Sequence, residues 1–265
     1  MTAMGALLRY LWRQHRAVLS PMAGALMLFE FLLTRIAPAP SEVSWMSGLL
    51  AIVPPQLLAL AGSEPGALSP AGFLSIGYGH PFFLLVLGAW TVRVTSAAVA
   101  GEIGRGTMDL LASRPITRTQ QVAASYAALG AGLIVLTGAA WTGTAIGLAV
   151  RDIGVHARTF VPVAAMAWLL FATFGGIGLI VTVLRRDAGS AIAWTAGFIA
   201  AEFVLEYLAR LWKPIAPLGA VSLFAYYRPQ ALVSGGSAAR ETLTLAFVAM
   251  VTVAVAIAAF RRRDL

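Results

Sequence analysis

Six apolar runs, each long enough to cross a lipid bilayer, constrain the fold of this chain more than any other feature. A helix needs about 20 apolar residues to span the hydrocarbon core, and spans must be helical because backbone amides find no water in lipid. Charged residues make up only 11% of the 265 residues, against about 25% in soluble domains. The sequence therefore predicts an all-α, polytopic membrane protein with a single transmembrane domain over 1–265. Its six helices are expected at roughly 17–34, 82–100, 121–149, 160–184, 190–208 and 242–260.

Basic residues favour one orientation of these spans. With the N-terminus inside, the inner segments carry eleven arginines and the outer segments carry seven basic residues. An excess of Arg and Lys marks cytoplasmic loops, so we expect both termini in the cytoplasm and the protein in the cell inner (cytoplasmic) membrane. The net charge of +8 does not indicate nucleic-acid binding, because the arginines are scattered at helix ends rather than gathered in one basic surface.

Three further segments lie before or between the spans. Residues 1–16 combine arginines with aromatic residues, which favours an uncleaved interfacial N-terminal helix over a signal peptide. Residues 35–81 and 209–241 are expected to be outer loops. Within the first loop, two adjacent prolines interrupt the apolar segment 41–62. This pattern predicts two short helices at the outer surface, with a re-entrant hairpin as the alternative.

The loop after the second span, residues 101–118 with the sequence GEIGRGTMDLLASRPITR, gathers charges between two long apolar runs. Its glycines predict a break in the chain. A short helix should follow, opened by Thr107, carrying Leu110 and Leu111 on one side and ended by Pro115. The bland alternative is an ordinary basic loop that its arginines hold inside.

This loop resembles the segment after the second membrane helix in the ABC type-2 transporter permease family. Gly104 departs from the pattern, because relatives often carry a charged residue there, and Arg105 is a plausible further match. The residues that fall on the family's pattern are Glu102, Gly106, Thr107, Leu110, Leu111, Ser113, Pro115, Ile116 and Arg118. A narrower similarity, to the branch that contains the nitrous oxide reductase maturation permease, rests on PPQLLALAG together with GEIGRGT and SRPITR.

The resemblance implies a six-helix permease subunit of an ATP-driven exporter. The short cytoplasmic helix within 101–118 would be the coupling helix that docks into an ATP-binding cassette ATPase subunit. The implied partners are two copies of that ATPase, a second permease subunit in a homodimer, and the lipid bilayer. ATP and Mg²⁺ would bind to the ATPase, and this chain would hold no cofactor. Coupling to the ATPase would involve Glu102, Arg105, Gly106, Thr107, Leu110, Leu111, Ser113, Pro115 and Arg118.

The residues offer no enzyme site of their own. A phosphate-binding ATPase loop needs a lysine after a glycine-rich turn, and the only lysine is Lys213, between Trp212 and Pro214. The absence of cysteine rules out disulfides and thiolate metal sites. His15, His80 and His156 are solitary, and boundary or loop roles are expected for all three. We therefore expect no catalytic residues and no metal ligands.

Two ionisable residues within the spans are candidate functional residues, because charges inside a membrane are costly. They are Arg93 and Glu30. For Arg93 an alternative is that its helix begins near Phe73 and the guanidinium extends toward the cytoplasm. Gly143 and Gly147 have the G-x-x-x-G spacing that permits close helix packing, and we expect this packing inside one subunit rather than between two.

Two rival functions belong to other classes. An ion-coupled secondary transporter could use Arg93, Glu202 and Glu206, but it should show inverted repeats and broken helices. A non-transporting membrane assembly factor would have no need of an ATPase-docking loop. A separate ATPase subunit that copurifies with the chain would distinguish the permease from both.

Overall fold

The computed structural model describes residues 3–38, 69–108 and 116–263. Within these ranges six helical stretches are long and apolar enough to cross a membrane, which confirms the predicted all-α class. Four are single helices, one is the consecutive pair α4 and α5, and one joins the 3-10 helix η1 (Ala157–Phe160) to α9. Their bounds are α1 (Ala3–Ile36), α4 (Pro70–Gly79) with α5 (Pro81–Ala98), α8 (Arg118–Val150), α9 (Val161–Leu184), α10 (Ala188–Leu211) and α13 (Ala239–Arg262).

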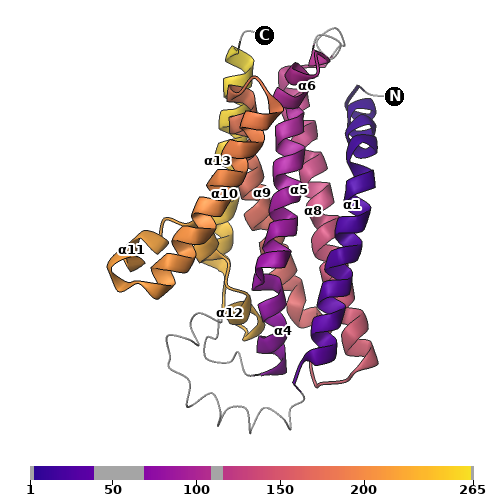
Figure 1. Ribbon diagram of the computed structural model, residues 1–265, viewed down its shortest axis with the longest axis vertical. Helices are drawn as coiled ribbons and strands as arrows, with labels where there is room; N and C mark the ends of the chain where they lie inside the picture. Colours follow the sequence, from indigo (N-terminus) through magenta and orange to yellow (C-terminus); the bar gives the residue numbers. More distant parts are fainter. Residues whose placement is uncertain (1–2, 39–68, 109–115, 264–265) are drawn as a thin grey trace.

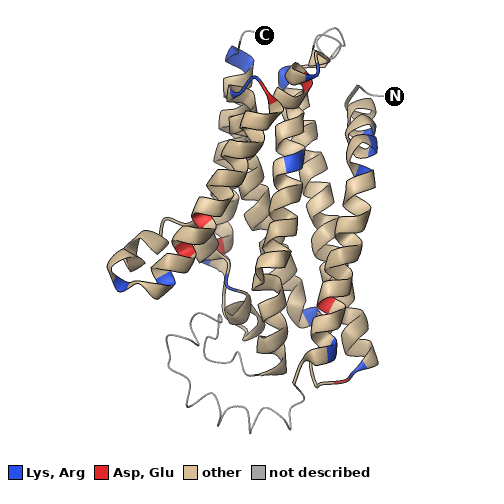
Figure 2. Ribbon diagram, in the orientation of Figure 1, with Lys and Arg blue, Asp and Glu red and all other residues tan. Residues whose placement is uncertain are grey.

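The long helices run side by side in an elongated bundle (Figure 1). Helix α9 is the central helix, because it packs against α5, α8, α10 and α13, while α1 packs along α8. Both termini lie at one end of the bundle together with the short helix α6 (Ala100–Gly104). Helix α4 lies at the other end. Figure 2 shows charged residues at the α6 end and, on α10, part-way along the bundle, whereas long stretches of the helices carry none.

The second span begins earlier than the sequence indicated, so the predicted outer loop 35–81 is wrong for its last residues. Pro70 and Pro81 occupy the first turns of α4 and α5, where a proline costs no hydrogen bond. Between them, Nδ1 of His80 accepts a hydrogen bond of 3.1 Å from the Phe82 amide. Arg93 consequently lies five residues before the end of α5 at Ala98, which favours the alternative of an early helix start over a mid-membrane position.

The first span is one continuous helix without a break near residue 16, and it contains Pro21. The interfacial placement of 1–16 stays a prediction, and the predicted surface helices of 41–62 lie outside the described residues. Helices α1 and α8 pack closely through the two glycines of the G-x-x-x-G pair. A Cβ on Gly143 would lie 2.1 Å from the backbone oxygen of Met27, and one on Gly147 would lie 2.5 Å from Cβ of Thr34. Packing within one chain is therefore confirmed.

Short elements connect the remaining helices. The 3-10 helix η1 (Ala157–Phe160) precedes α9. Between α10 and α13 the chain forms η2 (Lys213–Ile215), α11 (Ala216–Gly219), η3 (Leu223–Tyr226) and α12 (Pro229–Val233). The Tyr227 hydroxyl donates a hydrogen bond of 3.0 Å to the Tyr78 carbonyl and so joins this connection to α4.

Candidate functional site

The short helix α6 and the turn that follows it are built around the carboxylate of Glu102, which is 3% exposed. Arg105 donates to Oε1 at 2.5 Å and the Thr107 hydroxyl donates to Oε2 at 2.5 Å. From α1, the Tyr10 hydroxyl donates to Oε1 at 3.4 Å. These bonds neutralise and satisfy a charge that would be costly to bury alone. We call this group of four residues the Glu102 junction.

A glycine turn completes the Glu102 junction. Gly106 has φ +67°, a left-handed conformation that glycine adopts without strain. The Gly106 amide donates to the Ile103 carbonyl and the Thr107 amide donates to the Glu102 carbonyl. This pair of bonds is the Schellman motif that commonly ends a helix. It fixes the direction in which the chain leaves α6 toward Met108.

Part of the predicted coupling segment lies outside the described residues, namely Leu110, Leu111, Ser113 and Pro115. The residues that Thr107 was predicted to cap also lie there. Within the described residues the carboxylate of Glu102 faces inward, which leaves it no exposed oxygen for a basic group of a partner. Arg118 does not contact the Glu102 carboxylate. Its Nη1 donates instead to two carbonyls at the end of α13, that of Phe260, at 2.9 Å, and that of Arg263.

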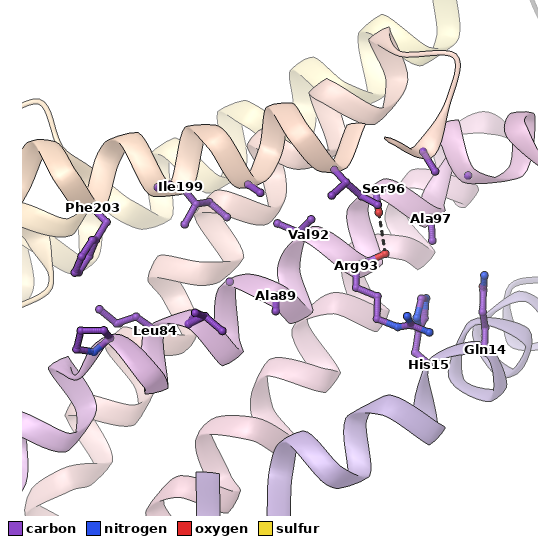
Figure 3. Close-up of a pocket in the computed structure, with 18 of the residues that line it drawn as sticks. Gln14, His15, Leu84, Ala89, Val92, Arg93, Ser96, Ala97, Ile199 and Phe203 are labelled. Carbon is purple, nitrogen blue, oxygen red and sulfur yellow. Dashed lines mark hydrogen bonds between the residues drawn. The ribbon is translucent and has the colours of Figure 1, made fainter. Parts of the chain in front are cut away.

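A groove of about 780 Å³ runs along α5 between α1 and α10 (Figure 3). Most of its lining is apolar, with Leu84 and Val92 from α5 and Ile199 and Phe203 from α10. Its polar residues are Gln14, His15, Arg93, Ser96 and Arg105, and no acidic residue lines it within the described part of the chain. The groove thus combines an apolar wall with a cationic end near α6.

Three side chains at the cationic end have unused hydrogen-bonding capacity. His15 is 3% exposed, and within the described residues neither ring nitrogen has a hydrogen-bond partner. The same holds for Oε1 of Gln14. Figure 3 shows the side chain of Arg93 extending toward His15. Among the described residues Arg93 forms no ion pair, whereas Arg105 already pairs with Glu102.

His15, for which a boundary or loop role was expected, lies inside α1 with a buried side chain, which excludes a loop position. The signal that could have placed it is the helical spacing of the buried residues Leu7, Leu11, His15 and Leu19, which puts the imidazole on the inward face. The sequence reasoning also missed Gln14, which is next to it. A polar residue at an apolar position of such a stripe was the available clue.

Glu30, the second candidate, lies deep between helices on the same face of α1 and is 0% exposed. A Cβ added to Gly77 would lie 2.6 Å from its Oε2, so the carboxyl packs directly on that glycine. The Thr144 hydroxyl lies near the carboxyl but pairs with Tyr78 at 3.0 Å. Neither carboxyl oxygen has a hydrogen-bond partner within the described part of the chain. Glu30 therefore occupies a closed site away from the groove.

The acidic residues near the end of α10 have structural partners. The Leu223 amide donates to Oε2 of Glu202 at 2.7 Å, which holds the start of η3. Arg210 pairs with Glu206 at 2.9 Å, one helical turn away. Neither Glu202 nor Glu206 is among the residues that line the groove with Arg93.

Neither a model of a known protein family nor any curated protein matches this chain. The chain is a multi-pass helical membrane protein with six candidate spans among its described residues.

Proposed function

We propose that this chain is the membrane-spanning permease subunit of an ATP-driven ABC exporter. The observation that carries the proposal is the Glu102 junction. Glu102, Arg105, Gly106 and Thr107, which the family resemblance singled out, form one hydrogen-bonded unit at the end of the bundle. An ordinary basic loop, held inside only by its arginines, would not require a buried carboxylate that accepts hydrogen bonds from three side chains.

The contacts of α6 support a role in transmitting movement. Tyr10 bonds the junction to α1, and the Ala100 amide donates to the Thr182 hydroxyl of α9 at 3.0 Å. A displacement of the segment after Thr107 would therefore act on α1, α5 and α9 together. In the proposed complex, a separate ATPase subunit that binds ATP and Mg²⁺ supplies this displacement when it closes on the docked coupling helix.

The proposed assembly contains two permease copies and two ATPase subunits in the inner membrane. Both termini lie at the same end of the bundle as α6 (Figure 1), which suits a cytoplasmic docking end. The arginine distribution points the same way. This chain contributes no phosphate-binding loop, because its single lysine is in η2, so ATP hydrolysis belongs to the partner.

The test is recovery of an ATPase with the affinity-tagged full chain, purified in detergent after co-expression with any ATP-binding cassette protein that the neighbouring genes encode. The wild type should bring down this ATPase and show hydrolysis only in its presence. Leu110→Asp with Leu111→Asp should abolish recovery, because a charge in the docking groove must be desolvated. Arg158→Ala, at the opposite end of the bundle, is the matched control. Equal recovery of the ATPase with the leucine variant, or none with the wild type, would refute the proposal.

Orientation has its own test, made simple by the absence of native cysteine. A membrane-impermeant maleimide added to intact cells should label Ser234→Cys, after α12, and leave Arg262→Cys, at the end of α13, unlabelled. Permeabilised cells should label both. Outside labelling of Arg262→Cys in intact cells would reverse the proposed topology.

The ion-coupled alternative gains no support from the contacts. Of its candidate acids, Glu202 accepts a hydrogen bond from the Leu223 amide and Glu206 forms an ion pair with Arg210. The assembly-factor alternative predicts stable expression without any ATPase partner, and the recovery experiment decides it.

A further inference from the structure

We propose that the groove along α5 binds an anionic phospholipid taken from the bilayer, with its phosphate at Arg93, His15 and Gln14 and an acyl chain between α5 and α10. The proposal deepens the proposed function by naming the substrate class of the exporter, and to that extent it rests on that function. The binding itself is a property of this chain alone.

The length of the groove suits an extended chain. Helix α5 has 18 residues and so extends about 27 Å at about 1.5 Å per residue. The groove of about 780 Å³ is lined from Pro81, at the start of α5, to Gly101 and Arg105 beyond its end. An extended acyl chain can therefore lie along the groove.

The walls have the composition that an alkyl chain requires. Leu84, Leu85 and Val92 face Ile192, Ile199 and Phe203 across the groove. Leu85 is 68% exposed and Ile192 is 44% exposed, so the groove is open along its length to the surrounding lipid. A ligand can thus enter sideways from the membrane, and its tail would form van der Waals contacts with the apolar walls.

The cationic end supplies what a phosphate requires. Buried polar groups are nearly always hydrogen-bonded, and unsatisfied ones are costly. Yet the ring nitrogens of His15 lack partners among the described residues, and the side chains of His15 and Gln14 both line the groove. Gln14 would donate to a phosphate through its side-chain NH2, because its Oε1 only accepts hydrogen bonds. Arg93 extends to the same place (Figure 3) without a carboxylate partner in the described part of the chain. Guanidinium and imidazole donors together match the oxygens of a phosphate.

The depth of Arg93 distinguishes a lipid from a soluble anion. Arg93 precedes the end of α5 by five residues, which places its Cα about 7.5 Å inside that end. From there a long side chain reaches the headgroup level of a bilayer. The tail would run from this level toward Pro81, as does a lipid of the leaflet at the α6 end. A small soluble anion would leave the apolar part of the groove unoccupied.

The experiment measures lipid binding to the purified full chain by native mass spectrometry, with dioleoyl phosphatidylglycerol and dioleoyl phosphatidylcholine as probes. Phosphatidylglycerol should bind at least about tenfold more tightly. Arg93→Gln should weaken it about tenfold and leave phosphatidylcholine unchanged. Ile199→Trp, which fills the tail region, should weaken both lipids. Arg158→Gln, an exposed arginine at the opposite end, is the matched control and should bind both lipids as the wild type does.

Several results would overturn the inference. Equal binding of the two lipids by the wild type, or unchanged phosphatidylglycerol binding by Arg93→Gln, would remove the phosphate site. If glycerol phosphate displaced phosphatidylglycerol completely, the ligand of the site would be a soluble anion rather than a lipid. A dimer that Ile199→Trp dissociates, without bound lipid in the wild type, would make the groove a contact between copies.

The substrate assignment is tested separately in the copurified ATPase complex. Phosphatidylglycerol should raise its ATP hydrolysis in the wild type and not in Arg93→Gln. Lipid bound by the chain without such stimulation would overturn the assignment as substrate. Failure to recover any ATPase would instead refute the proposed function, and the binding measurements on the isolated chain would be unaffected.

Discussion

The Thr107 hydroxyl donates a hydrogen bond of 2.5 Å to Oε2 of Glu102, a carboxylate that is 3% exposed. Hydrogen bonds to charged groups contribute about 1.5–3 kcal/mol. Thr107→Val keeps the shape of the side chain and removes the donor. It should therefore lower the free energy of unfolding by about 1–3 kcal/mol, seen as a lower unfolding temperature in detergent.

The matched control for Thr107→Val is Glu206→Gln, which removes the half-exposed ion pair with Arg210. Such pairs contribute at most about 1 kcal/mol, so this variant should unfold near the wild-type temperature. If Thr107→Val melts no lower than Glu206→Gln, the Glu102 junction does not depend on that hydroxyl.

The contact of Gly143 with Met27 predicts a second, steric effect. A methyl group on Gly143 would lie 2.1 Å from the Met27 backbone oxygen, so Gly143→Ala must force α1 away from α8. Overpacking of this kind costs about 1–3 kcal/mol. Gly138→Ala in the same helix meets nothing within 4 Å and should be neutral or more stable by roughly 0.5–1 kcal/mol. Thermal unfolding of both variants decides the matter, and equal melting would contradict the close packing.

Arg118 should hold the end of α13. Its guanidinium donates to the carbonyls of Phe260 and Arg263 and lies over the Phe260 ring, 5.5 Å from its centroid. Arg118→Gln should therefore speed amide hydrogen exchange in the last turn of α13 severalfold, while the middle of that helix is unchanged. Arg262→Gln, an exposed arginine on the same turn, serves as the control. If amides in the last turn of α13 exchange at the wild-type rate in Arg118→Gln, the hydrogen bonds of Arg118 do not stabilise that turn.

Asp187 makes the start of α10 dependent on pH. The backbone amide and the hydroxyl of Ser190 donate to its carboxylate, and these bonds lower the pKa of Asp187 below its usual 3.8. A lowered pKa in the folded state means that the ionised cap stabilises the fold above about pH 4 and is lost as pH falls through the folded pKa.

The measurement for Asp187 is the difference in melting temperature between the wild type and Asp187→Ala. The variant should melt lower at pH 7, and the difference should shrink by pH 3. Comparing the two proteins at each pH cancels the acid effects that both share. A difference that grows on acidification would have the wrong sign for this cap.

The sequence allowed the spans to be predicted but not all of their ends. Serine, glycine and proline around residues 69–81 have the composition of a loop, yet the structure uses Ser69, Pro70 and Pro81 as helix-starting residues. Local composition does not distinguish a loop from two capped helices placed end to end, because both use the same residues. Because the span starts at Pro70 rather than near residue 82, Arg93 lies near the end of the span and not at its middle.

What the sequence determined by itself is the set of properties that depend on the bilayer and on local hydrogen bonding. The apolar runs required six helices, because lipid offers backbone amides no other partner. The G-x-x-x-G spacing also predicted a close approach between helices. These outcomes depend on composition and on residues within one or two turns of each other.

Tertiary structure alone decided which side chains meet. Tyr10 and Glu102 are 92 residues apart along the chain, and His15 and Arg93 come together only because α1 packs beside α5. The inward-facing carboxylate of Glu102 and the cationic end of the groove both follow from that packing. Hydrophobicity and periodicity fix the face that a helix buries, but not its neighbour, because the neighbour is chosen by the shape and free hydrogen bonds of the whole bundle.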